Sequence, residues 1–176
     1  LGGGGGLSSD AQQNTVGGTG AGDSFSGTDA QKNTLIGYNS GTSITTGDQN
    51  SAFGDRSLYS NTTGEKNAAF GVIALYNNTT GNQNTAFGTH ILWRNTTGSN
   101  NTAIGYDCLA HNTTASNNTA VGVTSGSAVT TGSYNVLLGY EAGKSITTAN
   151  YCTAVGATAP TIEFSNSNFK EVGVIG

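Results

Sequence analysis

Apolar and polar residues follow one another along this chain in an order that returns every 17 residues. The clearest part of the pattern is a five-residue phrase, Asn-x-x-x-Gly, which recurs at this interval without insertion. Its first residues are Asn33, Asn50, Asn67, Asn84, Asn101, Asn118 and Asn135, and Cys152 takes the place of Asn in the last copy. A fixed period of this kind is typical of a solenoid, in which each unit forms one coil against its neighbours.

Numbering the unit from this Asn shows which positions are apolar. Position three is small or aliphatic, position five is Gly, and position four is always apolar. The residues at position four are Ile36, Phe53, Phe70, Phe87, Ile104, Val121, Leu138 and Val155. Because neighbouring strand residues point to opposite sides, two adjacent apolar positions predict two buried surfaces. We expect position four to form the core ladder inside the coil, and the opposite surface to contact another subunit.

The second half of the unit comes in two variants. One has Leu at position nine followed by Asn-Thr-Thr, as at Leu58, and the other has Gly followed by Ile or Val and Thr-Thr, as at Gly41. The paired Thr predict a second short strand, so each unit would be strand, turn, strand, turn. Dense Gly, Asn and Thr without a 3.6-residue period disfavour helix. The prediction is an all-β fold, a single-stack parallel β-solenoid (β-roll) with one repeat per coil.

Stacking of like residues explains how so polar a phrase can be repeated. Identical residues in successive coils lie about 4.8 Å apart, so Asn above Asn and Thr above Thr can pair their polar groups. About two or three buried apolar side chains per coil leave an isolated roll marginal against the cost of ordering the backbone. We therefore expect association between copies to supply further burial.

The ends of the chain depart from the repeat. Residues 1–13, with five consecutive glycines, predict a flexible tether, and residues 14–32 an atypical first coil or N-terminal cap with two extra residues. The array of eight repeats covers residues 33–168, and residues 169–176 form a partial repeat or a C-terminal junction. Pro160 is expected at a turn where the regular roll changes.

Composition narrows the classes of partner. Charged residues make up 9% of the chain and the net charge is −4, which argues against binding to nucleic acid or to anionic membranes. No apolar run reaches the length of a spanning helix, so membrane insertion by this segment is not expected. Cys108 and Cys152 lie more than two coils apart, too far for a disulfide between them, and a partly buried free thiol is expected.

Few residues suggest catalysis. His90 and Asp107 share position seven in adjacent units, so we expect neighbours that form a surface ion pair rather than an acid–base or metal pair, since no third group converges. His111 follows Arg94 at position eleven and is interpreted as a surface residue. No catalytic residue, metal site or cofactor is predicted, and the chain is not expected to be an enzyme.

Two sets of residues are candidates for contact with other molecules. Position ten carries Tyr59, Tyr76 and Trp93 in successive units, which would form either a stripe that stacks on glycans or a wedge between subunits; the wedge is favoured. Sequons for N-glycosylation begin at Asn61, Asn77, Asn78, Asn95, Asn100, Asn112 and Asn117. In a chain so rich in Asn and Thr, coincidence is the default explanation of these sequons.

The phrase Asn-Thr-Ala-[Phe/Ile/Val]-Gly, at 84–88, 101–105 and 118–122, resembles the YadA-type head repeats of trimeric autotransporter adhesins and related repeat regions of phage and viral tail fibres. The resemblance covers Asn33 to Gly156. It implies a trimer of left-handed parallel β-rolls with one repeat per coil. The repeat here is longer than that of the adhesin heads, and its second half, Leu-x-x-Asn-Thr-Thr-Gly, is more similar to fibre proteins.

Three functions follow as expectations. The first is a structural or adhesive segment of an extracellular fibre, on a cell or virion surface, that forms a homotrimer and attaches to a host glycan or protein. The second is a self-assembling extracellular filament whose subunits dock head to tail. The third is an ice-binding solenoid, which is weaker because adjacent Thr point to opposite faces and leave only one outward ladder.

Overall fold

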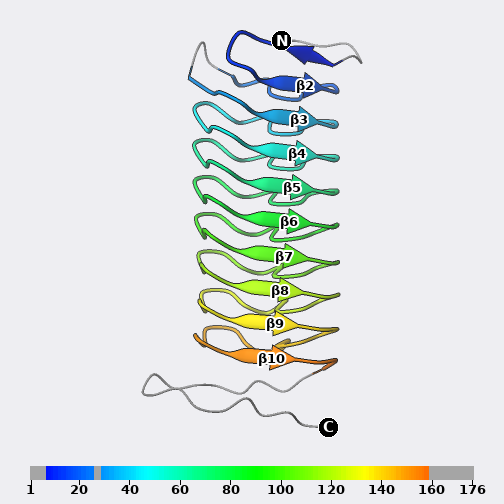
Figure 1. The fold of residues 1–176 in the computed structure, drawn as a ribbon, viewed down its shortest axis with the longest axis vertical. Helices are drawn as coiled ribbons and strands as arrows, with labels where there is room; N and C mark the ends of the chain where they lie inside the picture. The colour runs from blue at the N-terminus through cyan, green and yellow to red at the C-terminus, as the bar shows by residue number, and fades with distance from the viewer. Residues whose placement is uncertain (1–6, 26–28, 159–176) are drawn as a thin grey trace.

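The computed structural model describes residues 7–25 and 29–158 and shows a tall stack of coils (Figure 1). Within these residues there are ten strands in one sheet, in chain order, and no helix. The strands are β1 (Ser8–Ser9), β2 (Thr15–Gly17), β3 (Thr34–Ile36), β4 (Ser51–Phe53), β5 (Ala68–Phe70), β6 (Thr85–Phe87), β7 (Thr102–Ile104), β8 (Thr119–Val121), β9 (Val136–Leu138) and β10 (Thr153–Val155). The predicted all-β parallel solenoid with a repeat of about 17 residues is confirmed.

The register of the sheet places each residue above its equivalent in the next coil. Strands β2 to β10 pair in parallel, and Ala52 lies opposite Ala69, which lies opposite Ala86. Phe53 is aligned with Phe70 in the same way, and their ring centroids are 4.8 Å apart. The unbroken period in the sequence therefore sets the register, because any slip would separate equivalent residues.

Each coil turns at four recurring positions where the backbone has positive φ. These are position five, always Gly, and positions seven, nine and seventeen. Gly54, with φ of 134°, shows why position five is Gly: a Cβ there would lie 2.5 Å from the carbonyl oxygen of Gly71 in the next coil. Leu58 adopts a left-handed φ of 51°, a conformation that costs about 1 to 2 kcal/mol. Complete burial of its side chain offsets this cost.

The second strand predicted from the paired Thr does not form. Thr45 and Thr46 lie in a bend, and their backbone N–H groups both donate to the carbonyl of Thr62, at 3.0 and 3.3 Å. Successive N–H groups of a strand point in opposite directions, so two that converge on one acceptor cannot belong to a ladder. Each complete coil therefore has one strand of three residues, followed by a long series of turns.

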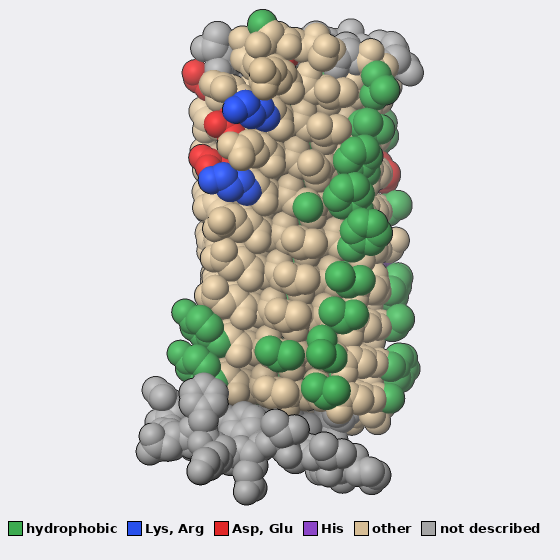
Figure 2. Space-filling view, in the orientation of Figure 1, with side chains coloured by type: hydrophobic (Ala, Val, Ile, Leu, Met, Phe, Trp, Pro, Cys, Tyr) green, Lys and Arg blue, Asp and Glu red, His purple; other side chains and the backbone are tan. Residues whose placement is uncertain are grey.

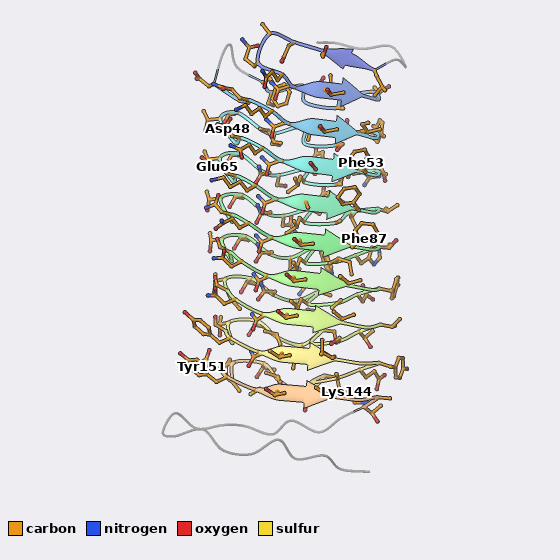
Figure 3. The ribbon with its side chains drawn as sticks, in the orientation of Figure 1. Asp48, Phe53, Glu65, Phe87, Lys144 and Tyr151 are labelled. Carbon is orange, nitrogen blue, oxygen red and sulfur yellow. The ribbon has the colours of Figure 1, made fainter. Side chains whose placement is uncertain are left out.

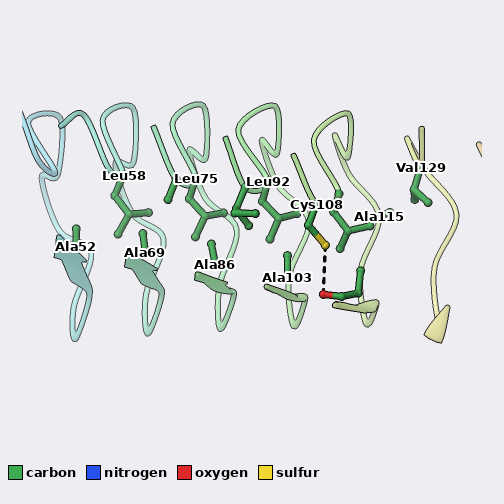
Figure 4. Close-up of a cluster of buried hydrophobic side chains, with 14 of the residues drawn as sticks. Ala52, Leu58, Ala69, Leu75, Ala86, Leu92, Ala103, Cys108, Ala115 and Val129 are labelled. Atoms are coloured by element: carbon green, nitrogen blue, oxygen red, sulfur yellow. Dashed lines mark hydrogen bonds between the residues drawn. The ribbon is translucent and has the colours of Figure 1, made fainter. Parts of the chain in front are cut away.

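The core lies between the strands and these turns, and its apolar side chains come from positions three, eight, nine and twelve. Figure 4 shows Ala52, Ala69 and Ala86 opposite Leu58 and Leu75, all of them fully buried. The pairing of a small residue at position three with Leu at position nine fills a narrow interior. Where position nine is Gly, as at Gly41, the space is filled instead by Leu35 at position three and Ile44 at position twelve.

The prediction that position four forms the internal core ladder is wrong. Phe53, Phe70 and Phe87 do form a continuous stack, with centroids 4.8 and 5.0 Å apart, but the stack lies on the outer surface. Phe87 is 55% exposed and Val155 65%. The remaining members, Ile36, Ile104, Val121 and Leu138, are likewise half-buried or exposed. A three-residue strand presents only its middle residue to the interior, so position three takes the core and position four faces outward.

Buried Asn side chains form the polar part of the interior. At position one, Asn50 donates from Nδ2 to Asn33 Oδ1 (3.1 Å) and to the Gly64 carbonyl (2.9 Å), and its backbone N–H donates to the same Oδ1 (2.8 Å). This arrangement recurs from coil to coil, and the ladder ends where Cys152 N–H donates to Asn135 Oδ1. The predicted Asn ladder is confirmed, and it satisfies backbone groups that the short strands leave without partners.

The N-terminal end of the stack is covered. Strand β1 pairs antiparallel with β2, and Asp10 accepts hydrogen bonds from the backbone N–H and Nδ2 of Asn14, at 2.8 and 3.0 Å. Asp10 thus occupies the place of the preceding Asn in the ladder. The sequence predicted that residues 7–13 belong to a flexible tether, but the pairing of β1 and the hydrogen bonds of Asp10 make them part of the cap. Residues 1–6 lie outside the described chain. Pro160 and the partial repeat at 169–176 also lie outside it.

Candidate binding surfaces

Outward apolar side chains form two files along the whole stack, which we call the apolar stripe. They occupy positions four and six on either side of the invariant Gly; the file at position four is unbroken, and Asp55 and Thr89 interrupt the file at position six. The members are Ile36, Tyr38, Phe53, Phe70, Val72, Phe87, Ile104, Tyr106, Val121, Val123, Leu138, Tyr140 and Val155. Figure 2 shows files of hydrophobic side chains running along the molecule, with Lys, Arg, Asp and Glu gathered mainly elsewhere on this face.

Some charged groups lie on a different edge of the coil, whereas Asp55 occupies position six within the stripe and pairs with Arg56 at position seven, at 3.4 Å. In Figure 3, Phe53 and Phe87 lie at one edge of the stack, and Asp48, Glu65 and Tyr151 at the opposite edge. The Nζ of Lys66 is 4.0 Å from a carboxylate oxygen of Glu65 at that second edge. A partner could therefore cover the apolar stripe without removing the charges of this second edge from water, but it would meet Asp55 in the coil of β4.

A hollow of about 430 Å³ lies beside the stripe. Ile73, His90, Asp107 and Thr124, all at position seven of successive coils, line one side. Trp93, Ala110 and Ser127 at position ten, with His111 at position eleven, line the other. The hollow exists because the side chains at position ten become small after Trp93, where Ala110 and Ser127 replace the large aromatic rings.

The coil after Ser127 has an ion pair at the equivalent positions. Glu141 at position seven pairs with Lys144 at position ten, and this contact lowers the pKa of Glu141.

The two residues singled out for possible acid–base chemistry meet in this hollow. His90 Nδ1 lies 3.3 Å from Asp107 Oδ1, and both side chains are partly exposed, so the predicted neighbours are confirmed as a surface pair. His111 is exposed, as predicted, and its Nδ1 lies 2.8 Å from the carbonyl oxygen of Ser127. Among the described residues, no group of three or more His, Cys, Asp and Glu is placed to hold a metal ion.

The aromatic residues at position ten point outward, as predicted from Leu at position nine pointing inward. Tyr59 and Tyr76 stack face to face, with centroids 5.0 Å apart and ring planes 3° apart. Trp93 is the last ring of the series, and the guanidinium of Arg94 lies 4.6 Å from its ring centroid. Tyr59 and Tyr76 therefore cover one face of each other, and the preceding coil has Thr42 and not a ring at this position.

Burial removes four of the seven sequons from consideration in the folded chain. Asn61, Asn78, Asn95 and Asn112 are fully buried and form a second ladder at position twelve, with Nδ2 to Oδ1 distances of 2.7 to 2.8 Å. An oligosaccharyltransferase cannot reach these amides without unfolding the coil. Asn77 is half-buried, and Asn100 and Asn117 are exposed, so these three remain candidate acceptors.

The cysteines play no part in these surfaces. Cys108 is a buried free thiol whose sulfur lies 3.2 Å from the carbonyl oxygen of Ala120 (Figure 4). Burial raises its pKa to about 12, which keeps the sulfur protonated and unreactive at neutral pH. Cys152 is also buried and ends the position-one ladder. The expectation that the two are not joined to each other is confirmed.

One feature of the sequence could have predicted the hollow. The step from Trp93 to Ala110 at position ten is visible in the aligned units, but its meaning depends on positions seven and ten facing each other across the turn. That relation depends on the left-handed residues at positions seven and nine, which spacing alone did not reveal. Ile73, Ala110, Thr124 and Ser127 were missed for this reason.

In the part of the chain that the structure describes, there is no helix with the length and apolar character needed to cross a bilayer. Comparisons of the chain with protein-family models, curated proteins and solved structures found no match. The fold and the two surface features, the apolar stripe and the hollow below Trp93, are therefore the basis on which a function can be argued.

Proposed function

We propose that this chain is a structural and adhesive segment of an extracellular fibre, a cell-surface adhesin head or a viral tail fibre, in which three copies pack through the apolar stripe. The observation that carries the proposal is the stripe itself: large apolar side chains, Phe87 at 55% and Tyr140 at 54% exposure among them, continue along the full height of the stack. Continuous exposed apolar surface is typical of sites that bind other proteins.

The repeat makes the stripe suitable for a closed assembly. Equivalent residues are in register from β3 to β10, so parallel copies can meet coil by coil along their whole length. A closed assembly of copies around one axis covers every stripe. The number three is what the resemblance to adhesin heads and tail fibres implies.

An extracellular fibre also suits the rest of the surface. Outside the stripe the coil presents Thr, Ser, Asn and Gln side chains, and the backbone is held by ladders that repeat without change along the axis. A long array of this kind is suited to hold a contact surface away from its anchor. Attachment to a host glycan or protein would use the surface that the stripe leaves open.

The two alternatives have less support. A head-to-tail filament needs accessible ends, yet β1 and Asp10 already cover the N-terminal end of the ladder. For ice binding, the Thr at position fourteen, such as Thr63 and Thr80, are exposed, whereas the Thr at position thirteen are half-buried and donate to the next coil. One outward file of Thr is narrower than the flat multiple ladders that ice binding requires.

The decisive experiment is the solution mass of the full chain, measured by sedimentation velocity for wild type and for Phe87→Glu. We expect a trimer for the wild type and a shift toward monomer for the variant, because a carboxylate in the stripe would be buried without a partner on association. Thr97→Glu is the matched control: it adds the same charge to the same coil at an exposed position outside the stripe and should leave the trimer intact.

A wild-type monomer at all concentrations would refute the fibre proposal. So would a trimer that both variants leave unchanged, because the stripe would then not be the contact. Long concentration-dependent polymers would favour the filament instead.

A further inference from the structure

We propose that the hollow below Trp93 is a binding site for one neutral sugar unit of a glycan. The inference rests on the proposed function and deepens it, because it identifies the ligand class through which the segment attaches. The volume of about 430 Å³ is within the range of ordinary small-molecule sites and accommodates a pyranose ring.

The ring of Trp93 supplies the apolar contact. It is the last aromatic residue at position ten, and Ala110 follows it in the next coil, so no further ring covers its lower side. Arg94 lies over the indole but does not line the hollow, and the part of the ring that does is open to a ligand. The C–H faces of a pyranose pack on exposed aromatic faces, and Trp93 lines the hollow, whereas Tyr59 and Tyr76 stack on each other and do not line it.

The polar groups around the hollow are mainly hydrogen-bond acceptors. Because the carbonyl of Ser127 can only accept, His111 Nδ1 carries the hydrogen, and Nε2 of the neutral ring is left as an acceptor. His90 Nδ1 lies 3.3 Å from the Asp107 carboxylate, which can only accept, so this nitrogen also carries a hydrogen. Asp107 itself accepts only.

Thr124 adds to this set. Its hydroxyl donates to the carbonyl of Val123 at 2.8 Å, so the lone pairs of Oγ1 remain for a ligand. Sugar hydroxyls are donors and match such a lining. A carboxylate or sulfate would instead face the charge of Asp107 and several acceptors, so the site should discriminate against acidic sugars.

The position of the hollow agrees with a trimer built on the apolar stripe. The hollow uses positions seven, ten and eleven, whereas the stripe uses four and six, and the two meet where the rings of His90 and Tyr106 lie 5.7 Å apart. Copies that pack through the stripe would thus leave the hollow at the rim of the interface, once in each copy.

Binding can be measured by saturation-transfer NMR on the full chain. The neutral probes are the methyl glycosides of glucose, galactose, mannose and N-acetylglucosamine, and the acidic probe is the methyl glycoside of N-acetylneuraminic acid. We expect at least one neutral probe to bind and the acidic probe not to bind.

Two variants locate the site. Ala110→Tyr should reduce binding at least tenfold, because a tyrosine there would cover the lower side of Trp93 and fill the hollow. Tyr59 and Tyr76 show that this position tolerates successive stacked rings, so the variant should fold. Asp107→Asn should also weaken binding. Tyr59→Ala, at the same position three coils away, is the control and should change affinity less than twofold.

Failure of the two proposals can be told apart. If no neutral probe binds, if the acidic probe binds as well as the neutral ones, or if Ala110→Tyr binds like wild type, the sugar site is refuted even when the protein is a trimer. A monomer that binds the neutral probe and loses it in Ala110→Tyr would refute the trimeric fibre while keeping the sugar site.

Discussion

At the scale of single residues, the buried asparagines hold the coils together. Asn84 donates to the carbonyl of Gly98 at 2.8 Å and to Asn67 Oδ1 at 3.2 Å, and its own Oδ1 accepts the backbone N–H of Asn101 at 3.0 Å. The ladder of Asn side chains at position twelve ends with a polar atom that has no partner. Among the described residues, Asn112 Oδ1 is the one buried side-chain polar atom without a hydrogen-bond partner, because Val129 replaces Asn in the coil that follows.

Replacement of a ladder Asn should be costly. We expect Asn84→Ala to lower the free energy of unfolding by about 3 kcal/mol, because the buried N–H of Asn101 loses its acceptor. Chemical denaturation measures the change. Asn82→Ala is the matched control, since Asn82 Oδ1 also accepts a backbone N–H from a neighbouring coil, that of Glu65 at 2.7 Å, but is exposed to water that can replace it. Equal losses for the two variants would contradict the role assigned to burial.

At the scale of the coil, two packing solutions alternate within one backbone. Ala at position three with Leu at position nine is one solution, and Leu at position three with Gly at position nine is the other. The coil of β8 combines Ala120 with Gly126, and Leu109 and Leu137 of the neighbouring coils fill its space. Leu137 belongs to the second and packs between Gly126 and Gly143: a Cβ on either Gly would lie 2.6 Å from one of its methyl groups. The two variants noticed in the sequence therefore differ in which side of the interior supplies the large side chain.

This exchange predicts a specific coupling between two positions. Gly126→Leu alone should destabilise the chain by about 1 to 3 kcal/mol through overpacking against Leu137. Leu137→Ala alone should cost about 2 to 5 kcal/mol through the cavity it leaves. The double variant should be more stable than the sum of the two losses predicts, since truncation of Leu137 removes the methyl group that a side chain at position 126 would meet at 2.6 Å. Additive losses in thermal or chemical unfolding would contradict the exchange.

At the scale of the whole molecule, stability depends on contacts between neighbouring coils. Each strand from β3 to β9 contacts the strand before and the strand after it, and the interior is one continuous hydrophobic cluster from Val16 to Ala154. A solenoid of this type should tolerate the loss of a whole coil, because every ladder can rejoin in register.

Deletion of residues 50–66, one exact repeat, should retain the β-rich circular dichroism spectrum and the trimer, with a somewhat lower melting temperature. Deletion of residues 50–67, one residue more, should be much more damaging, because it removes Asn67 from the ladder and leaves a coil too short to close. Similar melting temperatures for the two deletions would show that the 17-residue period is not what sets the register.

The sequence by itself determined the repeat, and with it the parallel stack, the register and the Asn ladders, because an exact period allows one way of placing like residues in contact. It also indicated that His90 and Asp107 are neighbours and that the position-ten aromatics face outward. It could not show how the backbone turns within one coil. The left-handed residues at positions seven, nine and seventeen are mostly not glycine, and no local signal marks them.

Those turns decided three things that only the tertiary structure shows. They replaced the expected second strand by bends, they placed position three inside and the Phe53, Phe70 and Phe87 file outside, and they brought positions seven and ten together around the hollow. Periodicity specifies what lies above each residue, whereas the path around the coil specifies what lies across from it. A binding site needs both, because its residues come from neighbouring coils and from opposite sides of a turn.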